Sequence, residues 1–174
     1  MITLSLRQGI TANTRLLGTV EWSQWSRFKE LRLVSDGTSA LSLVPNLSGG
    51  GVPGVVPGTV IGAIPANWSD GWMFALGGEY DLNRQLTVRA GGAYEISPVD
   101  SPKKRLIGIP DNDRIWASLG ATYKWRDTYT FDVAYTHLFV KDSKIDRESL
   151  GGVHVLGNVN ASTDIISVSM KTKW

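Results

Sequence analysis

Acidic and basic side chains recur at alternate positions of several segments, and they are the residues best placed to do chemistry. They are Glu79, Arg89, Glu95, Arg114, Lys124 and Asp132. Opposite charges on one face of adjacent strands pair across the strands. An Arg or Lys without such a pair would be able to hold a carboxylate ligand. Arg89 is the best candidate for that contact, although a structural ion pair is the simpler interpretation for both Arg89 and Arg114. Trp116 shares this phase and is a further candidate to contact ligand.

The sequence contains no pattern of an enzyme, a metal site or a nucleic-acid-binding face. It has no cysteine, and its two histidines, His137 and His154, are isolated, so neither a thiolate nor a histidine metal cluster is expected. The glycines of SGGGVPG are not followed by GK[ST], which excludes a phosphate-binding loop. Charges of 18 basic against 16 acidic residues give no basic face for nucleic acid. We expect no catalytic residues and no cofactor.

Apolar and polar residues alternate with a period of two, which predicts β-strands. In 86–96, for example, Leu86, Val88 and Tyr94 lie on one face, with Arg89 and Glu95 on the other. The same alternation fills 2–10, 72–80, 114–125, 129–139 and 162–174. One long strand is predicted for 15–34, and its phase blurs after Trp25. The sequence therefore predicts seven strands.

The connections between these strands alternate in length. Short turns are expected near 11–14, 82–84 and 126–128, and long loops rich in Gly, Pro, Ser and Asp at 36–70, 97–113 and 141–161. The uncharged stretch 49–66 within the first loop contains too many Gly and Pro residues to form a helix. Short turns at one end and long loops at the other are typical of outer-membrane barrels, with the turns in the periplasm.

The two faces of the expected strands also suit a membrane. One face is apolar with aromatic residues near its ends, as in interfacial girdles. These are Trp72, Tyr80, Tyr94, Tyr123, Trp125, Tyr129, Phe139 and Trp174. We expect Phe74, Leu76, Val88, Leu119, Val133 and Val168 to face lipid, and Glu79, Arg89 and Lys171 to face inward. The predicted fold is all-β, an antiparallel transmembrane β-barrel in the bacterial outer membrane. A soluble sandwich, with the aromatic face buried, is the alternative.

Particular segments resemble the FadL/TodX family of outer-membrane transporters for long-chain fatty acids and aromatic hydrocarbons. The similar segments are VEWSQWSRFKEL (20–31), ALGGEYDLNRQLTVRAGGAYEISPV (75–99), IPDNDRIWASLGATYKW (109–125), AYTHLFVKD (134–142) and a terminal strand that ends in an aromatic residue. The combination of SPV with IPD-x-DR-x-W is the most specific. The resemblance extends from about residue 2 to 174 and is interrupted by 36–69.

The resemblance implies a fourteen-stranded barrel closed by an N-terminal hatch, of which 1–174 would be a single partial domain, the C-terminal seven strands. The hatch and the first strands would then be missing, as in a fragment of a longer gene product. The implied function is passive passage of hydrophobic compounds, either fatty acids or aromatic hydrocarbons, without chemistry. A general porin, or a barrel enzyme that acts on lipids, remains an alternative. The expected partners are hydrophobic small molecules, outer-membrane lipid and lipopolysaccharide, and the barrel-assembly machinery.

Three further segments are candidates for a role in such a barrel. Asp111, Asp113 and Arg114 could form a charge network that fixes an external loop, or Pro110 and Asp111 could be ordinary turn residues. The terminal strand, with Ile166, Val168, Met170 and Trp174 in one phase, resembles the signal read by the assembly machinery, or is a lipid-facing strand end. The apolar loop 36–70 has no Lys or Arg and could receive a hydrophobic ligand, or it could be an insertion without a role.

Overall fold

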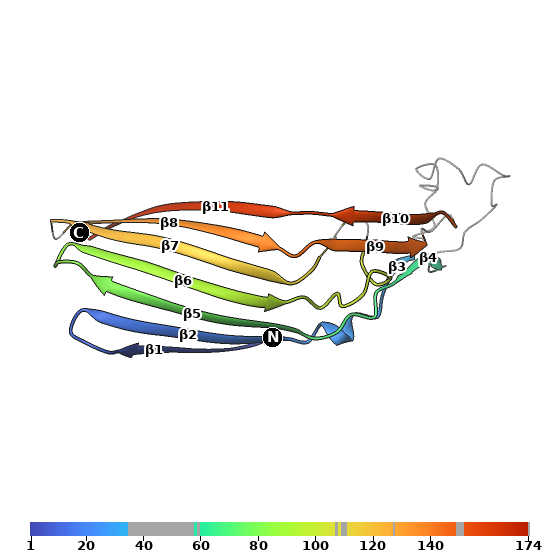
Figure 1. Cartoon of the computed structure of the whole chain (residues 1–174), viewed down its shortest axis with the longest axis horizontal. Helices are drawn as coiled ribbons and strands as arrows, with labels where there is room; N and C mark the ends of the chain where they lie inside the picture. The colour runs from blue at the N-terminus through green and yellow to red at the C-terminus, as the bar shows by residue number, and fades with distance from the viewer. Residues whose placement is uncertain are drawn as a thin grey trace.

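Seven long antiparallel strands form one continuous sheet (Figure 1). The computed structural model describes residues 1–34, 58, 60–106, 108, 111–126, 128–148 and 152–173. In sheet order the strands are β1 (Ile2–Gly9), β2 (Thr14–Ser23), β5 (Gly71–Asp81), β6 (Leu86–Ile96), β7 (Arg114–Trp125), β8 (Tyr129–Val140) and β11 (Ser162–Thr172). Each strand pairs with the next in sequence order within the sheet, as in a meander. The predicted all-β class and the seven antiparallel strands are confirmed.

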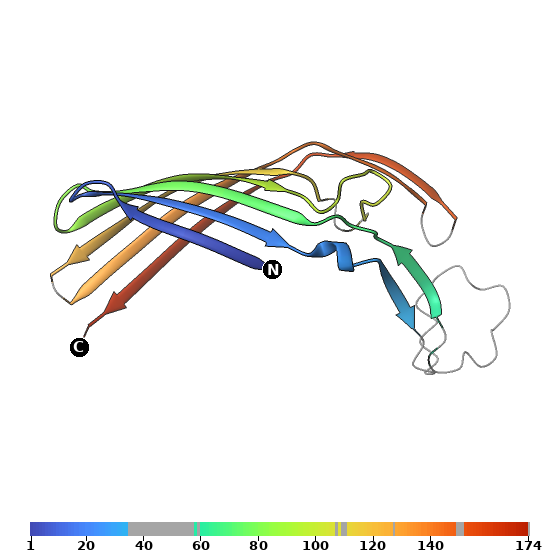
Figure 2. The same ribbon diagram turned by 90° about the horizontal axis from the view of Figure 1, so that it is seen from below.

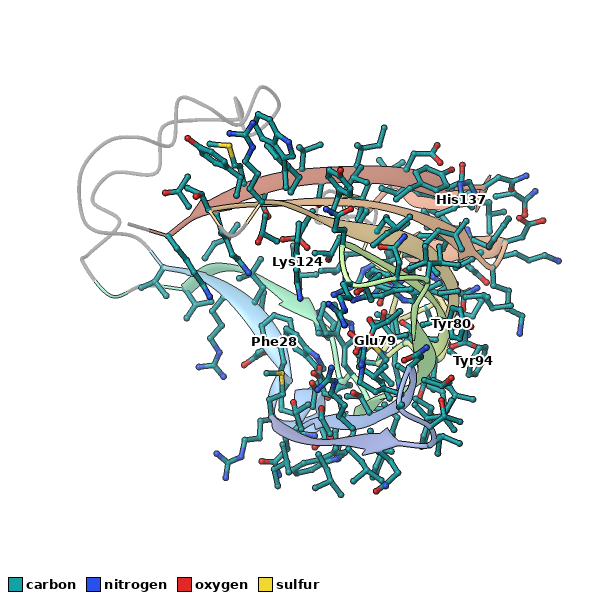
Figure 3. The ribbon with its side chains drawn as sticks, turned by 90° about the vertical axis from the view of Figure 1, so that its left-hand side faces the viewer. Phe28, Glu79, Tyr80, Tyr94, Lys124 and His137 are labelled. Atoms are coloured by element: carbon teal, nitrogen blue, oxygen red, sulfur yellow. The ribbon has the colours of Figure 1, made fainter. Side chains whose placement is uncertain are left out.

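The sheet is strongly curved, so it has a concave and a convex face (Figure 2). Viewed along the strands, Glu79 and Lys124 lie in the hollow of the sheet (Figure 3). Tyr80, Tyr94 and His137 lie on its outer side. Because successive side chains of a strand point to opposite faces, these labelled residues fix the orientation of their whole strands. The phase with the charged residues is concave and the phase with the aromatic residues is convex.

The convex face is apolar and exposed over most of its extent. Leu76 is 69% exposed, Leu119 is 63% exposed and Val168 is 76% exposed. Phe74 and Val133 are also exposed, and Val88 is half-buried. In water such an exposed apolar face would promote aggregation, whereas in a membrane it contacts the lipid chains. Among the described residues, no helix is long and apolar enough to cross a membrane.

Short turns connect the strands at one end of the sheet, and long segments connect them at the other (Figure 1). The β5–β6 turn shows how little chain the short end needs. The side-chain oxygen of Asn83 accepts hydrogen bonds from the backbone N–H groups of Gln85 and Leu86, both at 2.8 Å. Asn favours such turns because its side chain replaces a backbone acceptor.

The long strand predicted over 15–34 is interrupted, and this expectation was wrong. β2 ends at Ser23, a 3-10 turn follows at Trp25–Arg27, and a separate strand, β3, covers Glu30–Val34. The carboxylate of Asp70 accepts hydrogen bonds from Trp22 Nε1 (3.2 Å) and from the Ser26 N–H (3.0 Å). Trp68 packs against the rings of both Trp25 and Phe28. These contacts turn the chain where the alternation of the sequence blurs.

Two of the predicted loops contain further strands. β4 (Val60–Pro65) lies within the expected 36–70 loop and pairs with β3. β9 (Ser143–Glu148) and β10 (His154–Val159) form a hairpin within the expected 141–161 loop. Both loop predictions were therefore wrong for these residues. Residues 36–57 and 59 of the first loop lie outside the described residues. The expected role of this loop as a landing site for ligand falls on them.

The convex face generates a direct test of strand phase. Leu119→Arg should destabilise the membrane-inserted barrel by about 2–4 kcal/mol, because it places a charge in the apolar band. Ser118→Arg, one residue earlier on the concave face, should cost less. The measurement is reversible unfolding of each variant from lipid vesicles, in the complete barrel. Equal stability of the Leu119→Arg protein and its parent would show that the faces are assigned wrongly.

Candidate functional site

A cluster of arginines around Glu79 lies on the concave face. The Glu79 carboxylate is within 2.7 Å of Arg7 Nη2, 2.8 Å of Arg15 Nε and 2.8 Å of Arg89 Nε. The register of the strands produces this arrangement, since Arg15, Glu79 and Arg89 are direct neighbours across β2, β5 and β6. Glu79 is 8% exposed although its partners reach solvent. One buried carboxylate thus ties three strands and the edge strand β1 together.

The network continues along the same face toward both sides. Arg15 makes a two-pronged contact with Asp81, at 2.8 and 2.6 Å, and Thr87 donates to the same carboxylate at 2.7 Å. On the other side, Arg89 Nη1 donates to Thr122 Oγ1 at 2.5 Å, and Thr122 donates to Asp132. Two-pronged Arg–carboxylate pairs fix geometry as well as charge. The concave face is therefore cross-linked in the half of the sheet near the short turns.

Arg89, the expected carboxylate contact, is engaged by Glu79 and Thr122. Its side chain is 41% exposed, so it faces the hollow but does not present an unused guanidinium. A carboxylate ligand would have to compete with Glu79 for it. Lys124 and Lys171 lie on the same face, and the structure gives neither of them an ion pair within the described residues.

A second cluster of charged residues lies on the concave face at the end of the sheet with the long connections. Arg114 Nη2 is 2.8 Å from Glu95 Oε1 and 3.2 Å from Asp111 Oδ1. Trp116 Nε1 donates to the other oxygen of Glu95, at 3.0 Å. Glu95 and Arg114 are direct neighbours across β6 and β7. The structure brings these predicted residues together and leaves the Nε of Arg114 buried without a partner.

The segment before β7 is fixed by its acidic residues. Asp111 accepts from Ser97 Oγ at 2.6 Å, and Asp113 accepts from the Ser97 N–H and from the Tyr94 hydroxyl, both at 3.1 Å. Asn112 donates to the carbonyls of Lys141 and Asp142, beyond the end of β8. Pro110 lies outside the described residues.

Two buried arginines hold the long external segments together through backbone carbonyls. Arg105 is 4% exposed and donates to the carbonyls of Asp111 (2.7 Å) and Lys144 (2.5 Å). Burial lowers the pKa of the Arg105 guanidinium from its usual range. Arg147 of β9 donates to the carbonyls of Lys103 and Pro65, the latter at the end of β4. These contacts join the 97–113 segment to both external hairpins.

Five residues of this architecture were not singled out in the sequence. They are Arg7, Arg15, Asp81, Arg105 and Arg147. Arg7, Arg15 and Asp81 point to the same face of the sheet as Glu79. Following the alternation of polar residues from strand to strand through the short turns would have identified them. No sequence signal marks Arg105 and Arg147, because their partners are carbonyls of distant segments.

The residues of the expected assembly signal are only partly described. Ile166, Val168 and Met170 are exposed on the convex face of β11, and Trp174 lies outside the described residues. His137 also lies on the convex face (Figure 3), with its Nδ1 2.7 Å from Asp164 Oδ1. It is thus separated by the sheet from Asp132, as its phase predicts. The described residues contain no group of three or more potential metal ligands.

A curved sheet with an apolar outer face, a charged inner face and short turns at one end defines a class of protein, the outer-membrane β-barrels. The chain belongs to the family described as outer membrane protein transport protein (OMPP1/FadL/TodX), whose model matches residues 1–174. The predicted family and the bacterial outer-membrane location are confirmed. The family consists of transport proteins rather than enzymes, in agreement with the expectation from the sequence.

Relatives with names and a solved structure support this membership. The chain is 32% identical over 128 residues to a putative outer membrane protein of Neisseria meningitidis. This alignment covers 74% of the chain and 25% of that protein. It is 29% identical over 128 residues to the long-chain fatty acid transport protein of Escherichia coli K12, with 74% and 24% covered. A crystal structure of a Pseudomonas aeruginosa FadL homologue matches with a TM-score of 0.82 and 28% identity, covering 98% of the chain and 34% of that structure. The chain thus spans about a quarter of the length of the curated relatives it matches.

The Glu79 cluster generates a stability prediction. Glu79→Gln should destabilise the complete barrel by roughly 3 kcal/mol, because it leaves three arginines side by side without their shared carboxylate. The same change at Glu30, whose partner Arg32 is 61% exposed, should cost less than about 1 kcal/mol. Unfolding in urea, followed by tryptophan fluorescence in lipid vesicles, measures both. Similar losses for the two variants would contradict a central role for Glu79.

Proposed function

We propose that this sheet forms part of the wall of a larger barrel through which hydrophobic compounds cross the outer membrane by binding and diffusion. The observation that carries the proposal is the sheet itself, apolar and exposed outside and charged inside. Membership of a transport family supports it. No residue acts chemically on the substrate in this proposal, and the side chains of the concave face line its path.

The edges of the sheet indicate that more strands complete the wall. In the described part of the chain, β1 pairs only with β2 and β11 pairs only with β8. In lipid, each unpaired backbone N–H or C=O costs several kcal/mol, so open edges do not persist there. We infer that strands beyond this sequence pair with β1 and β11, which would make the chain a partial domain.

The charges of the concave face favour a selective path over a general porin. A porin constriction needs charged side chains that face the water of the pore. Here Arg15, Glu79 and Arg89 are joined to one another, and Arg114 is joined to Glu95 and Asp111. The paired charges act as cross-links of the wall. Long-chain fatty acids and aromatic hydrocarbons are the substrate classes we propose, the first named for a relative from Escherichia coli.

Transport by the complete barrel should discriminate by hydrophobicity. Liposomes that contain the barrel should take up toluene or oleate faster than barrel-free liposomes, because the path binds apolar molecules. They should not swell in a small sugar such as arabinose. Uptake is followed with radiolabelled compounds and swelling by light scattering. Sugar-driven swelling without hydrophobic uptake would favour the porin instead.

The isolated chain should not transport. Seven strands at about 4.8 Å spacing make a sheet about 34 Å wide. Closed on itself, this sheet would be narrower than an eight-stranded barrel, whose interior is already filled by side chains. Residues 1–174 alone, refolded in detergent and reconstituted, should show neither heat-modifiable migration nor substrate uptake. Uptake by this chain alone would disprove the need for further strands.

A further inference from the structure

A cavity of about 250 Å³ lies between the outer ends of β2, β5, β6 and β7. Trp25, Trp116, Met73 and Pro98 contribute aromatic and apolar surface to its lining, and polar and apolar surface are present in similar amounts. Trp72 and Ile96 also border it, with side chains in the phase of the convex face. Glu21, Ser23, Gly71 and Glu95 complete the lining. A cavity of about 150 Å³ is enough for benzene, so this one accommodates a single aromatic ring with a short substituent.

Of the described residues that line the cavity, the charged ones are two carboxylates, Glu21 and Glu95. They lie in one row across the sheet, with Met73 between them, since Glu21 pairs with Met73 and Met73 pairs with Glu95. Glu95 is satisfied, because one oxygen contacts Arg114 and the other accepts from Trp116 Nε1. Arg114 also contacts Asp111, so its charge is shared by two carboxylates.

Within the described residues, Glu21 has no cationic partner. The side-chain hydrogen bond that it accepts from the described part of the chain comes from Thr3 Oγ1, a neutral donor at 3.2 Å. Every Lys, Arg and His of the sequence lies in the described part of the chain, and none of them forms an ion pair with Glu21. A carboxylate accepts about four hydrogen bonds, so Glu21 keeps most of its capacity for a donor in the cavity. Among the carboxylates of the concave strands β2, β5 and β6, Glu21 thus differs from Glu79, Asp81 and Glu95, each of which contacts an arginine.

We propose that this cavity binds a compact organic cation with an apolar body, of the class of primary arylalkylamines. The ammonium group would donate to Glu21 and lie near Trp25 and Trp116, whose ring faces attract cations. The ring would pack against Met73 and Pro98. A ligand carboxylate would be repelled by both glutamates, so the site selects against fatty acids. This inference rests on the proposed function in one respect, namely that the concave face of the sheet faces the lumen of the barrel.

The test is direct binding to the complete barrel in detergent micelles, by calorimetry with barrel-free micelles as reference. The probes are 2-phenylethylammonium, 3-phenylpropionate and propylbenzene, which have similar shapes and different charges. The cation should bind at least about tenfold more tightly than the carboxylate. Because binding is measured without transport, failure here leaves the transport proposal intact, and a failed uptake assay does not affect this one.

Glu21→Gln should remove the preference for the cation over the carboxylate and lower the affinity for the cation by about tenfold. Glu148→Gln, on the external β9–β10 hairpin, should leave this affinity unchanged. If Glu21→Gln does not fold, Gly71→Leu provides the second variant. A side chain at Gly71 would lie beside Trp25 and Pro98, with its Cβ at 3.5 and 3.6 Å from them, and would fill the cavity. It should abolish cation binding. Equal affinities for the three probes, or unchanged cation affinity in the folded variants, would overturn the proposal.

Discussion

The hydrogen-bonding needs of the backbone in lipid determine the rest of this structure. Lipid offers no partner to an N–H or C=O group, so a strand that crosses it must be paired along both sides. The five inner strands of the sheet meet this requirement, each with two antiparallel neighbours. Pairing in turn assigns every side chain to the convex or the concave face. A change of one residue in register would exchange the two faces, and charges would then enter lipid.

Ion pairs compensate many of the charges on the concave face, and this explains why it tolerates so many. A lone buried carboxylate is costly, whereas Glu79 lies among three guanidinium groups from three other strands. The same cluster crosses the sheet at right angles to the strands and therefore resists slippage between them. The cavity near Glu21 differs from this cluster, because there one carboxylate is left without a cation. Among the described carboxylates of β2, β5 and β6 on this face, Glu21 is therefore the one that a cationic ligand would be best placed to meet.

The two ends of the sheet are stabilised by different means. At the short end, a few hydrogen bonds within each turn are enough, as at Asn83. At the long end, Arg105 and Arg147 reach carbonyls of segments far apart in the sequence. A guanidinium group carries five N–H donors, so one side chain satisfies several carbonyls that lack strand partners. These contacts, together with the edge-on and tilted packing of Trp25 and Phe28 against Trp68, hold the external segments in place.

The sequence by itself determined the class, the strands and the two faces, because alternation with a period of two is a local property. β6 and β7 begin and end where the alternation predicts, and Leu119 and Val168 face outward as their phase requires. It also indicated that Glu79, Arg89, Glu95 and Arg114 share one face. Only the tertiary structure decided which of them pair, because partners depend on register between strands. It likewise decided the break after Ser23, the two external hairpins and the roles of Arg105 and Arg147, since these depend on contacts such as Trp22 with Asp70 that join residues far apart in the chain.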